Sequence, residues 1–155
     1  MKDKPLPPKD RSAERSAILP NGEEGQLLQT IIDSLADAVS VVDEKGMGLM
    51  INRAYTRITG MTAEQVLNKP ATVDIAEGES VHFQVLKTGK PVKGVRMKVG
   101  PWRRDVVVSC APLLINGDLK GSVGVIHDIS EIRRLMDELE RARRLVRRLE
   151  SRYTF

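Results

Sequence analysis

The alternation of apolar and polar positions divides the chain into a helical start, a strand-rich middle and a long helical end. Apolar residues at helical spacing from Gln26 to about residue 36 predict an amphipathic helix. Residues 39–42 and 47–51 then read as two short strands, joined by a turn in which Gly46 can take the left-handed backbone conformation. Three short helices are expected next, at residues 53–59, 62–68 and 79–87.

The following part of the chain reads as three longer strands, at residues 92–99, 105–115 and 121–127. In the first of them Val95, Met97 and Val99 alternate onto one face. The dipeptide Asn116-Gly117 separates the other two and is the strongest hairpin signal in the chain. We therefore expect these strands to form a meander.

After residue 130 the apolar positions recur at alternating intervals of three and four residues, which is the a/d repeat of a coiled coil. Glu138 at position g would face Arg143 at position e of a second copy, as parallel helices require. The pattern predicts a parallel homodimer, and the alternative is one amphipathic helix folded back on its own domain. The predicted interface consists of Ile132, Leu135, Leu139, Ala142, Val146 and Leu149.

Length and composition fit one domain with appendages. The chain has 155 residues, of which 41% are hydrophobic and 30% are charged. Residues 1–24 contain four prolines without apolar periodicity, so we expect them to be disordered or loosely packed. Residues 25–130 would form the folded domain. Residues 131–155 would form a helix leading to an effector domain that is absent from this chain.

The net charge of +4 resides in the two arms. Residues 1–15 carry five basic and three acidic groups, and residues 131–152 carry eight and five. A nucleic-acid-binding domain would more typically concentrate basic residues on its folded body, so we interpret the basic helix as a solvated face.

Cysteine content and hydropathy indicate a cytoplasmic protein. Cys110 is the single cysteine, which excludes an intramolecular disulfide and fits a reducing compartment. No apolar run approaches the ~20 residues that a membrane helix requires, so no membrane partner is expected.

Several motifs occur in the order and spacing of a PAS domain. They are DEKG between the first two strands, Asn52-Arg53-Ala54-Tyr55 at the first short helix, GMTAEQV after it, LKTGKPV before the long strands, and HDISEIRRL at the junction with the last helix. Residues 26–150 thus resemble the PAS family. The resemblance implies an α+β fold, namely a five-stranded antiparallel sheet with short helices on one face, a small enclosed cavity and a C-terminal coiled-coil helix.

The C-terminal run RRLVRRLESRYTF is similar to the linker of bacterial sigma-54-dependent transcriptional activators, the NtrC-type enhancer-binding proteins. This resemblance implies an N-terminal sensory domain that regulates transcription through an AAA+ ATPase. Sigma-54 RNA polymerase and DNA would then be partners of domains absent from this chain.

Within the expected sheet, the inward residues of the long strands would line the cavity and bind a small ligand. These candidate ligand-binding residues are Val95, Met97, Val108, Cys110, Val123 and Val125. The ligand's identity stays open. The alternative is a dimerisation or protein-interaction module without a small ligand.

The junction before the last helix is the candidate point of signal transmission. Asp128 and Ser130 can accept hydrogen bonds from the helix's first N–H groups, and Glu131 suits the positive end of its dipole. The alternative is a helix cap without a signalling role.

Cofactor and catalytic chemistry find little support in the sequence. His82 lies where haem-binding PAS domains carry their proximal histidine, but its neighbours do not resemble a haem pocket, so we interpret it as a surface or packing residue. Cys110 lies on a strand and not in a flavin-binding helical motif, which indicates a small core residue.

No phosphate loop, nucleophile elbow or metal motif is present, and we expect no enzymatic activity. Trp102 beside Arg103 and Arg104 suggests either an anion site or a tryptophan packed at the sheet edge.

Overall fold

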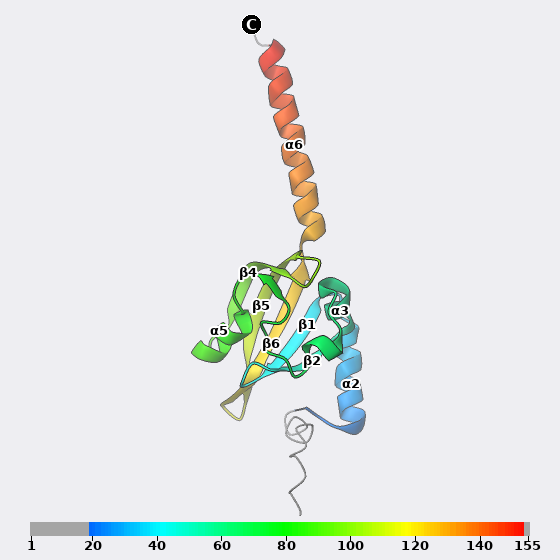
Figure 1. Ribbon diagram of the computed structural model, residues 1–155, viewed down its shortest axis with the longest axis vertical. Coiled ribbons are helices and arrows are strands. Elements are labelled where there is room, and N and C mark those ends of the chain that lie inside the picture. Colours follow the sequence, from blue (N-terminus) through cyan, green and yellow to red (C-terminus); the bar gives the residue numbers. More distant parts are fainter. Residues whose placement is uncertain (1–18, 154–155) are drawn as a thin grey trace, which may run out of the picture.

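An antiparallel sheet, short helices on one of its faces and a long projecting helix make up the molecule (Figure 1). The computed structural model describes residues 19–153. The sheet has six strands in the order β2-β1-β6-β5-β4-β3. The strands are β1 Ala38–Asp43, β2 Gly48–Ile51, β3 Ile75–Glu77, β4 Val92–Val99, β5 Arg104–Ile115 and β6 Asp118–Asp128. The helices are α2 Gly22–Asp33, α3 Arg53–Thr59, α4 Ala63–Val66, α5 Val81–Thr88 and α6 Ser130–Tyr153.

The expected α+β architecture is confirmed, with a correction to the number of strands. Five strands were predicted and the sheet has six, because β3 adds to the edge by pairing Ile75 with Val99 of β4. A strand of three residues is too short to show a period-two pattern, so it could not be predicted from the alternation of apolar residues.

The N-terminal helix α2 begins earlier than the apolar pattern indicated. It starts at Gly22, so residues 22–24, which were expected to be disordered or loosely packed, form its first turn. The rest of that expectation falls mainly on residues 1–18, which lie outside the described residues.

One buried asparagine holds three elements together. The Oδ1 atom of Asn52 accepts the backbone N–H of Tyr55 at 3.0 Å, which caps the start of α3, and also that of Val39 in β1 at 2.8 Å. Its Nδ2 atom donates to the carbonyl oxygen of Ile32 in α2 at 2.7 Å. This side chain therefore fixes α2 and α3 against the start of β1.

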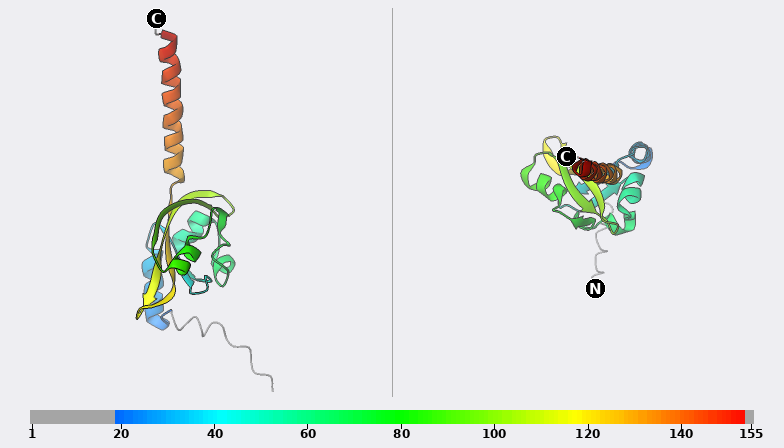
Figure 2. Two further views of the ribbon diagram at one scale, coloured as in Figure 1. Left: turned by 90° about the vertical axis from the view of Figure 1, so that its left-hand side faces the viewer. Right: turned by 90° about the horizontal axis from the view of Figure 1, so that it is seen from above.

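The core lies between one face of the sheet and the short helices, which Figure 2 shows on one side of the sheet. Its largest fully buried side chains include Tyr55 of α3, Val85 of α5, Val99 of β4 and Val106 of β5. Burial of such side chains is the main favourable term in folding, at about 1.5–3 kcal/mol each.

A close backbone approach explains the glycine at the start of β2. A Cβ atom at Gly48 would lie 2.5 Å from the carbonyl oxygen of Val66. Main-chain bonds also tie this part of β2 to the loop after α4, because Gly48 donates to Lys69 O at 2.9 Å and accepts from Asn68 N–H at 3.0 Å. Only glycine allows the two segments to come this close.

The helices of the described part of the chain include none that combines the length and apolar character needed to cross a membrane.

Candidate functional site

Helix α6 leaves the domain as an isolated rod (Figures 1 and 2). All its side chains from Glu131 to Tyr153 are exposed, including the predicted interface residues. Ile132, Leu139 and Val146 at position a are each about half exposed, at 50%, 53% and 52%. The helix points away from the sheet, which contradicts the alternative that it folds back on its own domain.

The junction between β6 and α6 contains no linker. The backbone N–H of Ile129 donates to the carbonyl oxygen of Asp105 at 3.0 Å, so pairing with β5 continues past the last residue of β6. The carbonyl oxygen of Ile129 then accepts the N–H of Arg133 at 2.8 Å, which is already a helical hydrogen bond. One buried residue, Ile129, therefore belongs to both the sheet and the helix.

The predicted junction residues have different contacts. Asp128 Oδ1 accepts the N–H of Ser130 at 2.9 Å, and Asp128 Oδ2 accepts a charged hydrogen bond from Arg104 Nη1 at 3.0 Å. Partial burial opposes ionisation of Asp128, but the Ser130 hydrogen bonds and Arg104 outweigh it and lower the pKa of this carboxyl. Ser130 was expected to accept from the first N–H groups of α6 as well, but its hydroxyl instead donates to Asp105 O at 3.4 Å. Glu131 is exposed in the first turn of α6.

Four of the six predicted cavity residues point to the inner face. Met97, Val108 and Cys110 are buried there, and Val95 packs partly buried against the same core. Burial raises the pKa of the Cys110 thiol to about 12, so it stays protonated and serves as the small core residue expected.

The assignment of Val123 and Val125 to the inner face was wrong. Both lie on the opposite face of β6, and Val125 is 41% exposed. A tight two-residue turn would pair Val123 with Cys110, but a register shift between Leu113 and Leu114 places Gly124 opposite Cys110 instead. A slip of one residue moves every following side chain to the other face of a strand.

The inner face of β6 carries Ser122, Gly124 and Ile126 in place of the valines. The ring of His82 lies directly over Gly124, where a Cβ atom would come within 2.9 Å of the ring and 3.1 Å of Cys110 Sγ. The missing side chain at Gly124 therefore makes room for the histidine.

His82 is a core residue that connects α5 to the neighbouring strands β1 and β6. Its Nε2 atom lies 2.8 Å from the hydroxyl of Ser40 in β1, and its Nδ1 atom lies 2.8 Å from the hydroxyl of Ser122 in β6. Burial lowers the pKa of His82 to about 4, so the ring is neutral at physiological pH. Both ring nitrogens are engaged, so neither is free to bind the iron of a haem in this arrangement.

The space beside His82 is small. A cavity of about 20 Å³ lies beside His82, which is room for about one water molecule. Its polar lining consists of Ser40, Asp74, Ser80 and His82, and its apolar lining includes Met97 and Ile126.

Tyr55 and Asp74 form a hydrogen-bonded pair at the cavity wall. The hydroxyl of Tyr55 donates to Asp74 Oδ2 at 2.5 Å. Burial raises the pKa of Asp74, and burial together with the neighbouring carboxylate raises the pKa of Tyr55 above its ordinary value. No sequence pattern marks His82, Tyr55 and Asp74 as one polar group, because they come from distant segments and share no spacing.

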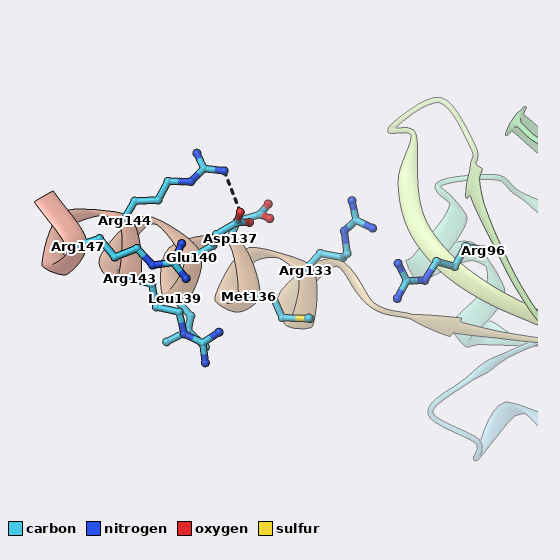
Figure 3. Close-up of a pocket in the computed structure, with 9 residues that line it drawn as sticks. All are labelled: Arg96, Arg133, Met136, Asp137, Leu139, Glu140, Arg143, Arg144 and Arg147. Atoms are coloured by element: carbon cyan, nitrogen blue, oxygen red, sulfur yellow. Dashed lines mark hydrogen bonds and ion pairs between the residues drawn. The ribbon is translucent and has the colours of Figure 1, made fainter.

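An open groove lies where α6 leaves the sheet (Figure 3). Its volume is about 420 Å³, and Arg96 of β4 faces the α6 side chains across it. The charges are mixed, and Glu140 pairs with Arg144 at 2.8 Å. Within the part of the chain that the structure describes, no three histidine, cysteine or acidic side chains are grouped to hold a metal ion.

Comparison with known proteins agrees with this architecture. The transcriptional activator RocR of Bacillus subtilis is 26% identical over 119 residues, which cover 72% of this chain and 26% of RocR. The sensor histidine kinase DcuS of Escherichia coli is 25% identical over 113 residues, covering 72% of this chain and 20% of DcuS. The chain thus spans about a quarter or less of the length of these relatives.

Solved structures share the fold. The PAS domain of a protein from Colwellia psychrerythraea matches 68% of this chain and 97% of its own, with a TM-score of 0.58 and 18% identity. The family model described as the PAS fold matches residues 26–129, which is well over half of the chain. The chain therefore belongs to the PAS family, whose sensory and signalling domains occur in transcriptional activators and histidine kinases.

Proposed function

We propose that this chain is the sensory and regulatory module of a longer bacterial transcription regulator, and that it acts through pairs of α6 helices. The observation that carries the proposal is the hydrogen-bonded junction without a linker at Ile129, from which a helix with an exposed apolar stripe projects. A rod of this kind is suited to carrying a change in the sheet to a following domain. We place the protein in the cytoplasm and assign it no enzymatic activity.

The stripe on α6 is explained best by a second copy of the chain. Six exposed apolar side chains in a/d spacing have nothing to cover them within the described residues. In a parallel pair they would pack as knobs into holes, and Glu138 would meet Arg143 of the partner helix. The sequence similarity of residues 143–155 to the linker of sigma-54-dependent activators makes a sigma-54-interacting AAA+ ATPase the proposed effector.

The packed core provides a route from the interior to α6. His82 contacts Ser122 of β6, and β6 continues through Asp128 into the helix. A shift of α5 relative to the sheet would therefore displace the strand that carries α6. Two arrangements of this contact, each favoured by a different state of the input, would give a two-state signal.

The small size of the cavity supports the alternative function, in which the module binds no small ligand. Sites for small organic ligands typically measure ~300–1,000 Å³, whereas the cavity beside His82 measures about 20 Å³. The second candidate function is therefore a dimerisation and protein-interaction module whose input is a protein partner. A small organic ligand would need side chains that line this cavity to move.

Native mass spectrometry of the chain and of a version ending at Ile129 tests the proposal. We expect a dimer for the full chain and a monomer for the shortened one, and a monomeric full chain at micromolar concentration would refute the paired rods. Retained small molecules in the same spectra would favour the ligand-sensing form, and a dimer without them the protein-interaction form.

The proposed effector is tested with a chimera in which this chain replaces the sensory domain of a sigma-54-dependent activator. Reporter transcription that changes when Asp128 is replaced supports the assignment. Transcription that does not depend on the chimera's sensory part contradicts it.

A further inference from the structure

The loop between β4 and β5 carries the single tryptophan of the chain and lies at the root of α6. Pairing of Val99 with Arg104 closes this hairpin, and pairing of Val106 with Asp128 places it beside the end of β6. Trp102 is 59% exposed. A large aromatic side chain therefore lies at the surface beside the start of α6.

The loop is fitted closely to the end of α3. The indole ring of Trp102 lies over Gly60, where a Cβ atom would come within 3.0 Å of three ring carbons. At Gly100 a Cβ atom would lie 1.8 Å from the carbonyl oxygen of Thr59. Two glycines thus allow direct contact between the loop and the last residues of α3.

The loop is also bonded to the wall of the cavity. The backbone N–H of Gly100 donates to the carbonyl oxygen of Asp74 at 2.6 Å. The side chain of Asp74 lines the cavity and accepts the hydroxyl of Tyr55 from α3. A displacement of α3 or of the cavity wall therefore moves the loop.

On its other side, the loop contacts Arg104, which pairs with the Asp128 carboxylate at the start of α6. The guanidinium of Arg104 lies 5.5 Å from the centre of the Trp102 ring, within the range of a cation–π contact. The same guanidinium donates to Asp128 Oδ2 at 3.0 Å, while Asp128 Oδ1 holds the N–H of Ser130. Arg104 is therefore held between the indole ring and the carboxylate that caps α6.

We infer that Trp102 is a positioning residue for α6: through Arg104 it fixes the carboxylate of Asp128 and so sets the direction in which the helix leaves the sheet. The inference rests on the proposed function for its meaning, because the direction of α6 is the output proposed above. It adds a second connection to α6, from α3 and the cavity wall, separate from the one through His82 and β6.

The test uses the full chain, labelled with ¹⁵N and ¹³C for NMR. In Trp102→Ala we expect the backbone amide resonance of Ser130 to shift and the pKa of the Asp128 carboxyl to rise towards its ordinary value. In Trp102→Phe, which keeps a ring face for Arg104, both should stay near wild type. Phe83→Ala is the matched control, because it also removes an exposed aromatic ring but lies on α5 beside the β1–β2 turn.

A role through Arg104 predicts non-additive effects. Once Arg104→Gln has raised the pKa of Asp128, adding Trp102→Ala should change it no further. Additive shifts, or an unchanged Ser130 amide in Trp102→Ala, overturn the inference. Circular dichroism identifies a variant that has lost its fold, and then Trp102→Leu, which keeps the apolar bulk without the ring face, replaces Trp102→Ala.

Failure of this inference is distinguishable from failure of the proposed function. The Asp128 pKa and Ser130 amide are measured within one chain, and native mass spectrometry of the same samples reports the dimer. A monomeric chain in which Trp102→Ala shifts the Asp128 pKa refutes only the paired rods. A dimeric chain without that shift refutes only the role of Trp102.

Discussion

Replacement of His82 by glutamine should reduce the acid sensitivity of this fold. The histidine is neutral and buried in the folded chain, with its pKa lowered to about 4, whereas in the unfolded chain its pKa is near the ordinary 6.5. Between these two pKa values the unfolded chain therefore binds a proton at His82, whereas the folded chain does not. Stability is complete above pH 6.5 and is lost as the pH falls from 6.5 towards 4.

The size of the effect follows from the shift. A difference of about 2.5 pKa units corresponds to about 3 kcal/mol at full extent, at 1.36 kcal/mol per unit. Between pH 7 and pH 4.5, where most of the titration takes place, the loss attributable to His82 is about 2 kcal/mol. Asp74 opposes it, because a carboxyl with a raised pKa binds its proton more readily in the folded state and so gains stability as the pH falls.

The assay is urea unfolding followed by far-ultraviolet circular dichroism at several pH values, for wild type and His82→Gln. Asp74 and the exposed His127 are present in both chains, so the difference between the two curves isolates His82. The variant starts with lower stability, because one amide cannot replace both serine contacts, but its stability should depend less on pH.

Parallel pH profiles for the two chains would refute this reasoning. They would mean that His82 is as easily protonated in the folded protein as in the unfolded chain. The buried serine–histidine–serine contact would then not describe the molecule in solution.

Three further substitutions test other parts of the structure. Leu139→Glu should convert a dimer into a monomer in analytical ultracentrifugation, whereas Arg141→Glu at an outward position should not; equal behaviour of the two would contradict the heptad seam. Gly124→Ala should cost about 1–3 kcal/mol in thermal unfolding because its Cβ would crowd the His82 ring, and a cost no larger than that of Val125→Ala would count against that packing. Asn52→Ala should lower the free energy of unfolding by about 1–3 kcal/mol, since it leaves the buried Val39 N–H without its acceptor.

The sequence predicted elements best where a local chemical signal marks their ends. Helix α3 spans the predicted residues because Asn52 caps it and Gly60, with a φ of 76°, ends it in the left-handed conformation. The hairpin at Asn116-Gly117 was likewise predicted from its turn residues. These signals act within a few residues and need no knowledge of tertiary contacts.

Features that depend on contacts between distant segments could not be predicted from the sequence. The register shift in β5 and β6 leaves no mark in the pattern of valines, so the inner face of β6 was assigned to Val123 and Val125 in place of Ser122 and Gly124. The place of His82 depends on serines about 40 residues away on either side. A polar residue and a glycine alternating within an apolar strand are the only hint that a polar ring lies against it.

The direct passage from β6 into α6 makes the length of the helix a determinant of orientation. Each residue of an α-helix turns the chain by about 100° and advances it by about 1.5 Å. Adding one residue to α6 would rotate whatever follows by more than a quarter turn, whereas adding seven would return it to within about 20° and move it roughly 10 Å farther away. A following domain would thus be sensitive to the phase of the insertion much more than to its size.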